Sequence, residues 1–189
     1  PAMSLAAAKQ MAEAKELDGW LVTLDFPSYL AVMTHADNRE LRREMYEAFS
    51  TRASDQGPNA GKWDNSEVMT EILTLRQELA TLLGFNHYGE YSLATKMAET
   101  PEQVIGFLTD LAVKSKVVAQ RDYDELAAYA KAQGVDDPQA WDLTYYGEKL
   151  KQEKYSVSQE ALRPYFPMPK VLDGLFTVAG KLFDIQISE

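Results

Sequence analysis

The sequence contains no cysteine among its 189 residues. Disulfide frameworks and thiolate metal sites are therefore excluded, and a reducing, cytoplasmic setting is expected. Long apolar runs are also missing, because the longest, from Tyr29 to Met33, is far shorter than the ~20 residues that span a bilayer. The first ten residues lack the basic start and apolar centre of a signal peptide. We expect no membrane partner.

Basic residues are scarce relative to acidic ones. Nineteen lysines and arginines against twenty-nine aspartates and glutamates give a net charge of −10, and no local basic patch offsets it. Such a chain repels a phosphate backbone, so nucleic acid is not an expected partner. Hydrophobic residues at 46% and charged residues at 25% are typical of a globular protein, and the length indicates one domain.

Residues that carry hydrolytic chemistry are equally scarce. The two histidines, His35 and His87, have no second histidine four residues away, so the helical zinc motif His-Glu-x-x-His is absent. The loop from Asn59 to Lys62 is too short a match to a phosphate-binding loop. We therefore predict no catalytic and no metal-binding residue in this chain, and its residues do not identify a substrate-binding site.

Helical patterns are abundant, and the clearest runs from Asp64 to Gly84. Asp64 and Glu67 have capping-box spacing, and Gly84 can adopt the left-handed conformation that ends a helix. Apolar residues recur at steps of three and four between them, which predicts a buried core helix around which the rest packs; they are Val68, Ile72, Leu75, Leu79 and Leu82.

Other start and stop signals predict further helices. Asp37 with Glu40, and Thr100 with Gln103, have capping-box spacing, and the second pair opens a long helix that ends near Gly134. The fold class is therefore all-α, an irregular multi-helix domain. One short strand is predicted near Trp20 to Leu24, and Ile185 to Glu189 begins to alternate like another strand. The remaining helices are predicted over residues 1–17, 27–36, 37–53, 141–155 and 171–183.

Two polar clusters have a structural and a functional interpretation. Arg39, Arg42 and Arg43 alternate with glutamates, which predicts a solvated, mutually paired surface. The stretch from Trp141 to Tyr146 places two tyrosine hydroxyls beside Asp142, a set that could orient a peptide. We favour the structural interpretation, with Asp142 as the N-cap of a helix.

Several stretches, in order, resemble the thimet-oligopeptidase family of zinc metallopeptidases. The resemblance covers essentially the whole chain and is carried by the spacing of the pieces more than by any one of them. Leu162 to Pro167, followed by Gly174-Leu175-Phe176, is more similar to the bacterial oligopeptidase branch than to the peptidyl-dipeptidase branch. The other matching pieces are residues 19–30, 46–54, 75–85, 92–98 and 141–146.

The resemblance implies a cytosolic enzyme of mostly helical fold that cleaves short peptides in a channel with one zinc ion. The family's zinc motif lies C-terminal to the matched segments, so no catalytic or metal ligand can be assigned to this chain. We thus expect residues 1–189 to be a single helical domain, a scaffold and channel-wall segment of a larger zinc oligopeptidase, inactive and zinc-free alone. Its partners would be short peptides and the catalytic part of the polypeptide. The alternatives are a peptidyl-dipeptidase and a stand-alone, non-catalytic helical interaction module.

Overall fold

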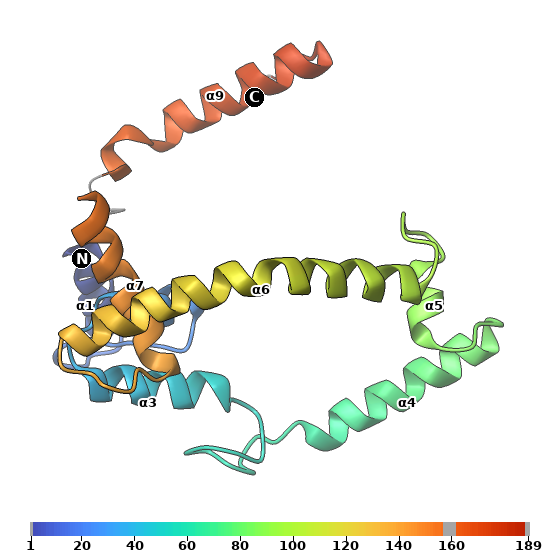
Figure 1. Ribbon diagram of the computed structural model, residues 1–189, viewed down its shortest axis with the longest axis horizontal. Coiled ribbons are helices and arrows are strands. Elements are labelled where there is room, and N and C mark those ends of the chain that lie inside the picture. The colour runs from blue at the N-terminus through green and yellow to red at the C-terminus, as the bar shows by residue number, and fades with distance from the viewer. Residues whose placement is uncertain (1, 157–161, 188–189) are drawn as a thin grey trace.

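The computed structural model describes residues 2–156 and 162–187, which form helices joined by loops (Figure 1). No strand occurs in this part of the chain, so the predicted all-α class is confirmed. The helices are α1 (Ala2–Glu13), α2 (Phe26–His35), α3 (Arg39–Ser50), α4 (Ser66–Leu82), α5 (Tyr88–Leu93), α6 (Pro101–Ala132), α7 (Ala140–Tyr155), the short 3-10 helix η1 (Arg163–Tyr165) and α9 (Met168–Phe183).

The predicted strand from Trp20 to Leu24 is wrong. Its backbone groups bond locally: the Leu21 N–H donates to the Ala8 carbonyl at 3.0 Å, and the Thr23 N–H donates to the Ser28 hydroxyl at 3.0 Å. A strand needs a neighbouring strand to satisfy its ladder, and an all-helical chain offers none.

The predicted strand start at Ile185 fails for the same reason. Residues 185–187 follow α9 as irregular chain in the structure, while Ser188 and Glu189 lie outside the described residues.

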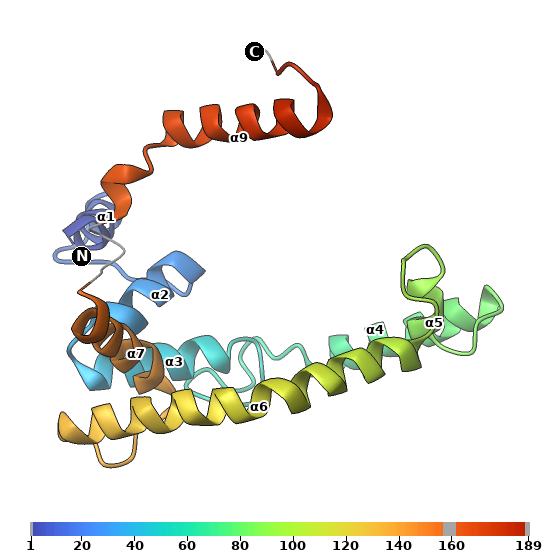
Figure 2. The same ribbon diagram turned by 45° about the horizontal axis from the view of Figure 1, so that its top comes forward.

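One end of the molecule is a packed helical cluster. Helices α2, α3 and α7 contact one another, and the C-terminal half of α6 packs on α7 (Figures 1 and 2). Val32, Met33 and Met45 form its buried core, and the rings of Tyr46 and Trp141 lie 5.9 Å apart beside it. This cluster is where the chain buries its own apolar surface.

The other half is an open frame rather than a packed body. Helix α6 extends away from the cluster to α5, and among the described elements α4 contacts only α5 (Figure 1). The prediction that α4 is the central buried helix is wrong, since Val68, Leu75 and Leu82 are 51%, 55% and 81% exposed. Periodicity specifies that a helix has an apolar face but not which element covers it. Here α5 is the only described element that contacts α4, and it leaves most of the apolar face exposed.

The ends of α6 and α4 test the capping predictions. Thr100 accepts the Gln103 N–H at 3.2 Å, so the cap of α6 is confirmed, although the Gln103 side chain accepts the N–H of Glu99 rather than that of Thr100. The Asp64–Glu67 box of α4 is wrong, because Asp64 accepts the Ser66 N–H at 2.9 Å and the helix begins at Ser66.

The two predicted glycine stops are confirmed, whereas the helices predicted over 1–17 and 37–53 end earlier, at Glu13 and Ser50. Gly84 and Gly134 follow α4 and α6 with φ of +84° and +91°, conformations that favour glycine.

Across residues 2–156 and 162–187, no helix combines the length and the apolar content that a bilayer span requires.

Candidate functional site

The two histidines lie on separate elements that do not contact each other. His35 is the last residue of α2, and His87 is the N-cap of α5, where its Nδ1 accepts the Glu90 N–H at 3.4 Å. Among the described residues, no three His, Cys, Asp or Glu side chains are grouped closely enough to hold a metal ion. The chain as described offers no ligand set that fits zinc.

The Asn59 to Lys62 loop uses its amides internally. The Ala60 N–H donates to the Gly57 carbonyl at 3.1 Å, and the Lys62 N–H donates to the Asn59 carbonyl at 3.0 Å. The Lys62 ammonium lies 4.3 Å from the centroid of the Trp63 ring. These groups are turned toward the loop itself, so the loop is not built as a phosphate cradle.

The best-built polar site lies where α3 crosses the start of α7. Asp142, fully buried, accepts from the Arg42 guanidinium at 2.8 Å and from that of Arg39 at 2.7 and 3.1 Å. It also accepts the Gln139 N–H at 3.0 Å, which makes Gln139 the N-cap of α7 and places Asp142 in its first turn. The predicted N-cap role of Asp142 is therefore wrong, while a structural role in starting the helix is what its contacts show.

Arg42 is the residue that sequence reasoning missed. It was predicted on a solvated surface, yet it is 1% exposed and also donates to the carbonyls of Ala36 at 2.6 Å and Trp141 at 3.2 Å. Arg43 behaves as predicted and pairs with Glu40 and Glu47.

The available signal for Arg42 was its register. It lies three residues before Met45 and seven before Phe49, on the apolar face of α3.

The pKa of Asp142 reflects this environment. Burial would raise the pKa of the carboxyl, but the hydrogen bonds from Arg39, Arg42 and the Gln139 N–H outweigh it, so the pKa lies below its ordinary value. Asp142 is therefore held as a carboxylate with its oxygens occupied.

A second set of polar groups adjoins the first on α7. The Tyr145 hydroxyl donates to Asp37 at 2.5 Å, and the Lys149 ammonium lies 3.4 Å from the same Asp37 oxygen. Burial and the bond to Asp37 raise the pKa of Tyr145, while the hydroxyl and Lys149 lower the pKa of Asp37. Asp37 thus joins α7 to the start of α3, and the predicted Asp37–Glu40 capping box is wrong, because Asn38 caps α3.

This arrangement holds two helices together through hydrogen-bonded ion pairs. The carboxylates are ionised and paired, and the tyrosine hydroxyl donates a hydrogen bond to Asp37, so no side chain of this set is a free base or an activated nucleophile. The geometry stabilises the crossing of α3 and α7, which brings residues about a hundred positions apart in the sequence together.

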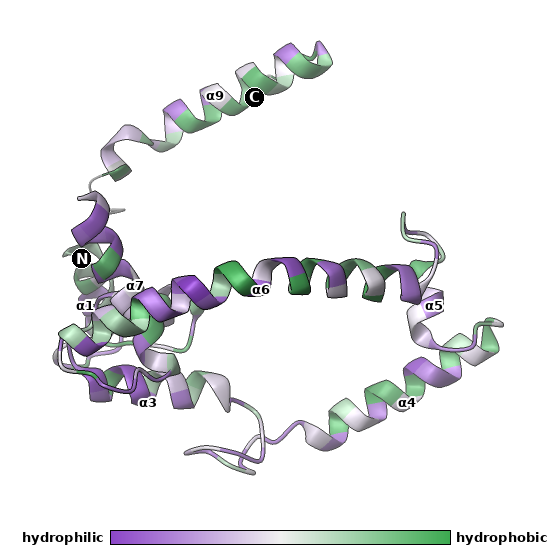
Figure 3. Cartoon of the chain, viewed as in Figure 1, coloured by the Kyte–Doolittle hydropathy of each residue, from purple (hydrophilic) through white to green (hydrophobic). Residues whose placement is uncertain are grey.

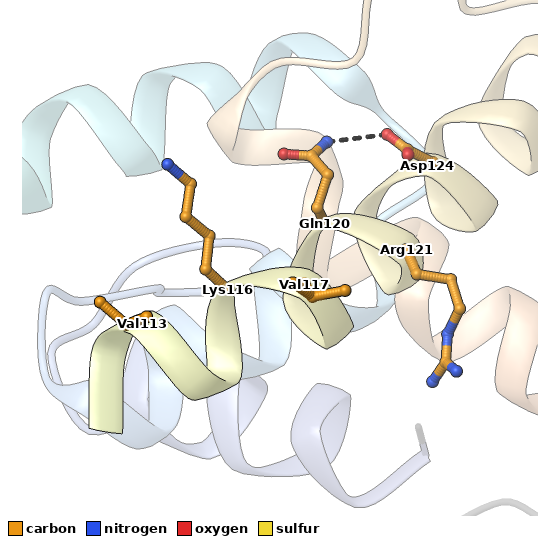
Figure 4. Close-up of a pocket in the computed structure, with 6 residues that line it drawn as sticks. All are labelled: Val113, Lys116, Val117, Gln120, Arg121 and Asp124. Carbon is orange, nitrogen blue, oxygen red and sulfur yellow. Dashed lines mark hydrogen bonds between the residues drawn. The ribbon is translucent and has the colours of Figure 1, made fainter. Parts of the chain in front are cut away.

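The surface also has a shallow hollow on α6. Val113, Lys116, Val117, Gln120, Arg121 and Asp124 line it, and all six belong to that one helix (Figure 4). Gln120 donates to Asp124 at 2.8 Å along the helix. Because no second element closes the hollow, it is an uncovered helix face rather than a substrate pocket.

Uncovered apolar faces are the most extensive feature of the chain. They follow α4, the N-terminal half of α6 and α9, and α9 packs on no other described element (Figure 3). Contiguous apolar surface on this scale marks an interface. The large exposed side chains of α9 include Val171, Leu172, Leu175, Phe176, Val178, Leu182 and Phe183.

Comparison with known proteins places the chain among peptidases. The model of peptidase family M3 matches residues 32–189. Oligopeptidase A of Escherichia coli K12 is 60% identical over 190 residues, covering 100% of this chain and 28% of the relative.

More distant relatives show the same partial coverage. Probable cytosolic oligopeptidase A of Arabidopsis thaliana is 46% identical over 89% of this chain and 24% of its own length. Dipeptidyl carboxypeptidase of Escherichia coli K12 is 32% identical over 98% of this chain and 27% of its own length. The chain thus spans about a quarter of the length of the curated relatives it matches.

Proposed function

This chain belongs to peptidase family M3, and on that premise we propose that it is the helical scaffold and channel-wall segment of a zinc oligopeptidase that hydrolyses short peptides. Residues 1–189 act as one helical domain whose partner is the catalytic part of the same polypeptide. The described residues offer no ligand set that fits zinc, so the zinc and its chemistry belong to that other part.

The observation that carries the proposal is the match to this family combined with the uncovered faces of α4, α6 and α9. A scaffold segment must present apolar surface to the parts that it supports, whereas a stand-alone interaction module needs one bounded patch. Three separate helices with uncovered faces favour the scaffold.

Similarity also separates the two peptidase branches. Identity to oligopeptidase A is 60%, against 32% to dipeptidyl carboxypeptidase over similar lengths. This difference favours cleavage within short peptides over removal of dipeptides from a C-terminus. The relatives from Arabidopsis thaliana include one described as organellar and one described as probably cytosolic, and for this chain we propose the cytoplasmic location.

The test uses the complete polypeptide that carries this sequence. We expect it to hydrolyse internally quenched peptides of about ten residues, to leave a folded protein substrate intact, and to lose activity with a chelator and regain it with zinc. A blocked C-terminus should not prevent cleavage, which separates the oligopeptidase from the dipeptidase. Absence of hydrolysis under all these conditions would contradict the proposal.

A further inference from the structure

Helix α5 begins with a histidine at the position where serine, threonine, aspartate or asparagine is usual. His87 has an extended backbone, with φ of −157°, and its Nδ1 accepts the Glu90 N–H at 3.4 Å. Glu90 in turn accepts the backbone N–H and the side-chain amide of Asn86 at 2.9 and 3.0 Å. This arrangement resembles a capping box in which an imidazole takes the place of the hydroxyl.

Gly89, the second residue of α5, makes room for the imidazole ring. A Cβ added there would lie 3.0 Å from Nδ1 and 3.1 Å from Cε1 of His87. Glycine is otherwise unfavourable within a helix, because it loses more backbone entropy than any other residue. The contact gives this glycine a physical reason, since a side chain at position 89 would push the ring away from the helix end.

Helix α5 forms the corner between α4 and α6 (Figure 1). Among the described elements, α4 and α6 each contact α5 but do not contact each other. The Gln77 side chain of α4 donates to the Asn86 carbonyl at 2.9 Å, directly before the histidine cap. The first turn of α5 is therefore part of the connection between two longer helices.

We propose that His87 is a pH-sensitive cap, which holds the first turn of α5 at neutral pH and releases it when the imidazole is protonated. A neutral imidazole accepts at one nitrogen, here Nδ1, and carries its proton on the other. A protonated imidazole donates at both nitrogens, so the Glu90 N–H loses its acceptor. Histidine takes up this proton at about pH 6.5, and the charge then also faces the positive end of the helix dipole.

The carboxylate of Glu90 attracts a protonated ring but does not restore the cap. Its Oε1 lies 3.9 Å from Nε2 of His87, and this pair is partly exposed. A carboxylate can pair with the ring, yet it offers the Glu90 N–H no acceptor in place of Nδ1. Hydrogen bonds from the side chain and backbone of Asn86 hold the pKa of Glu90 below its ordinary value, so this carboxyl stays ionised while a histidine titrates.

The helices packed on α5 bring one cation and one proline to this corner. The Arg76 guanidinium of α4 lies 5.0 Å from the centroid of the Tyr88 ring. Helix α6 approaches with Pro101, whose Cγ would lie 3.8 Å from a Cβ added at Gly89. Neither arginine nor proline changes its charge between about pH 5 and 8, so a change of the α5 cap in that range is assigned to His87.

The test measures amide hydrogen exchange in the complete polypeptide at about pH 7.5 and about pH 5.5, with each rate divided by the intrinsic rate at that pH. Mass spectrometry follows residues 86–93, which contain the histidine cap, and residues 99–106, which contain the cap of α6. That second cap is the hydroxyl of Thr100, which accepts the Gln103 N–H and does not titrate. His87→Asn keeps an acceptor at both pH values, whereas Gly89→Ala displaces the ring at both.

We expect protection over residues 86–93 to fall about 5-fold at the lower pH, the factor to which the loss of a helix cap corresponds, with residues 99–106 within about 2-fold. His87→Asn should remove the pH dependence, and Gly89→Ala should show the low protection at both pH values. Equal protection at the two pH values in the unsubstituted protein overturns the inference, as does a fall that His87→Asn retains. The readout is amide exchange rather than peptide hydrolysis, so the result does not depend on the proposed function.

Discussion

Replacing Asp142 by alanine should destabilise the helical cluster more than any other single change in α3 or α7. The substitution removes the buried partner of Arg42, which is itself 1% exposed, and leaves an uncompensated charge between two helices. Breaking one partner of a buried ion pair costs about 3–5 kcal/mol. Arg39 is 46% exposed and returns to water, so its lost pairing adds less than about 1 kcal/mol.

One feature of Arg42 places the cost of breaking the pair at the low end of that range. Its guanidinium keeps its bonds to the carbonyls of Ala36 and Trp141, which partly solvate the charge. The change also removes the acceptor of the Gln139 N–H at the start of α7, worth about 1 kcal/mol. Together these give a loss of about 3–4 kcal/mol in the free energy of unfolding.

The assay is urea unfolding followed by the fluorescence of Trp141, which packs at the site. Trp20 and Trp63 are 63% and 61% exposed, so replacing both by phenylalanine isolates this signal at little cost. With m of about 1–3 kcal/mol/M, Asp142→Ala should lower the urea midpoint by roughly 1–4 M. Glu47→Ala, which breaks an exposed pair with Arg43, is the control and should cost less than about 1 kcal/mol.

A paired substitution separates charge from packing. Arg42→Met with Asp142→Leu removes both charges and should cost much less than Asp142→Ala alone, because replacing a buried pair by apolar groups is close to neutral. An Asp142→Ala midpoint equal to that of the Glu47→Ala control would show that the buried carboxylate does not hold α3 against α7.

Three further predictions follow from the structure. Gly57 has φ of +78°, and a Cβ added there would lie 2.0 Å from the Thr51 hydroxyl. Gly57→Ala should therefore lower the free energy of unfolding by about 1–3 kcal/mol in the same urea assay. Gly106 lies in open space inside α6, so Gly106→Ala should raise that free energy by about 0.5–1 kcal/mol. Because the folded-state pKa of Asp142 is lowered, its stabilisation is present above the ordinary carboxyl pKa of about 4 and is lost as pH falls below it, so acid unfolding of Asp142→Asn should show a shallower slope below pH 4; an unchanged slope would contradict the assignment. Metal analysis of the dialysed chain should find no stoichiometric zinc, and one zinc per chain lost on replacing either histidine would contradict this.

The predictable part of this fold was the local part. Helix class, the Thr100 cap and the glycine stops at Gly84 and Gly134 depend on residues within one or two turns, and the structure confirms them. The burial of α4 could not be predicted, because Val68 and Leu82 specify an apolar face without specifying what lies against it.

The polar site shows the same division. Asp142 and Arg42 are a hundred positions apart. From the sequence alone, each would be paired with an oppositely charged or capping partner in its own helix. The two residues meet only because α3 and α7 cross, and a sequence pattern does not report that tertiary contact. Arg43, with Glu40 and Glu47 within one turn, was predictable for the converse reason.

We expect this chain to support peptide hydrolysis by the complete polypeptide without performing it. The most direct measurement compares the 189-residue chain with the complete polypeptide on one quenched peptide while zinc is titrated. We expect hydrolysis by the complete polypeptide that a chelator abolishes, and none by the 189-residue chain at any zinc concentration. Zinc-dependent cleavage by the 189 residues alone would contradict it.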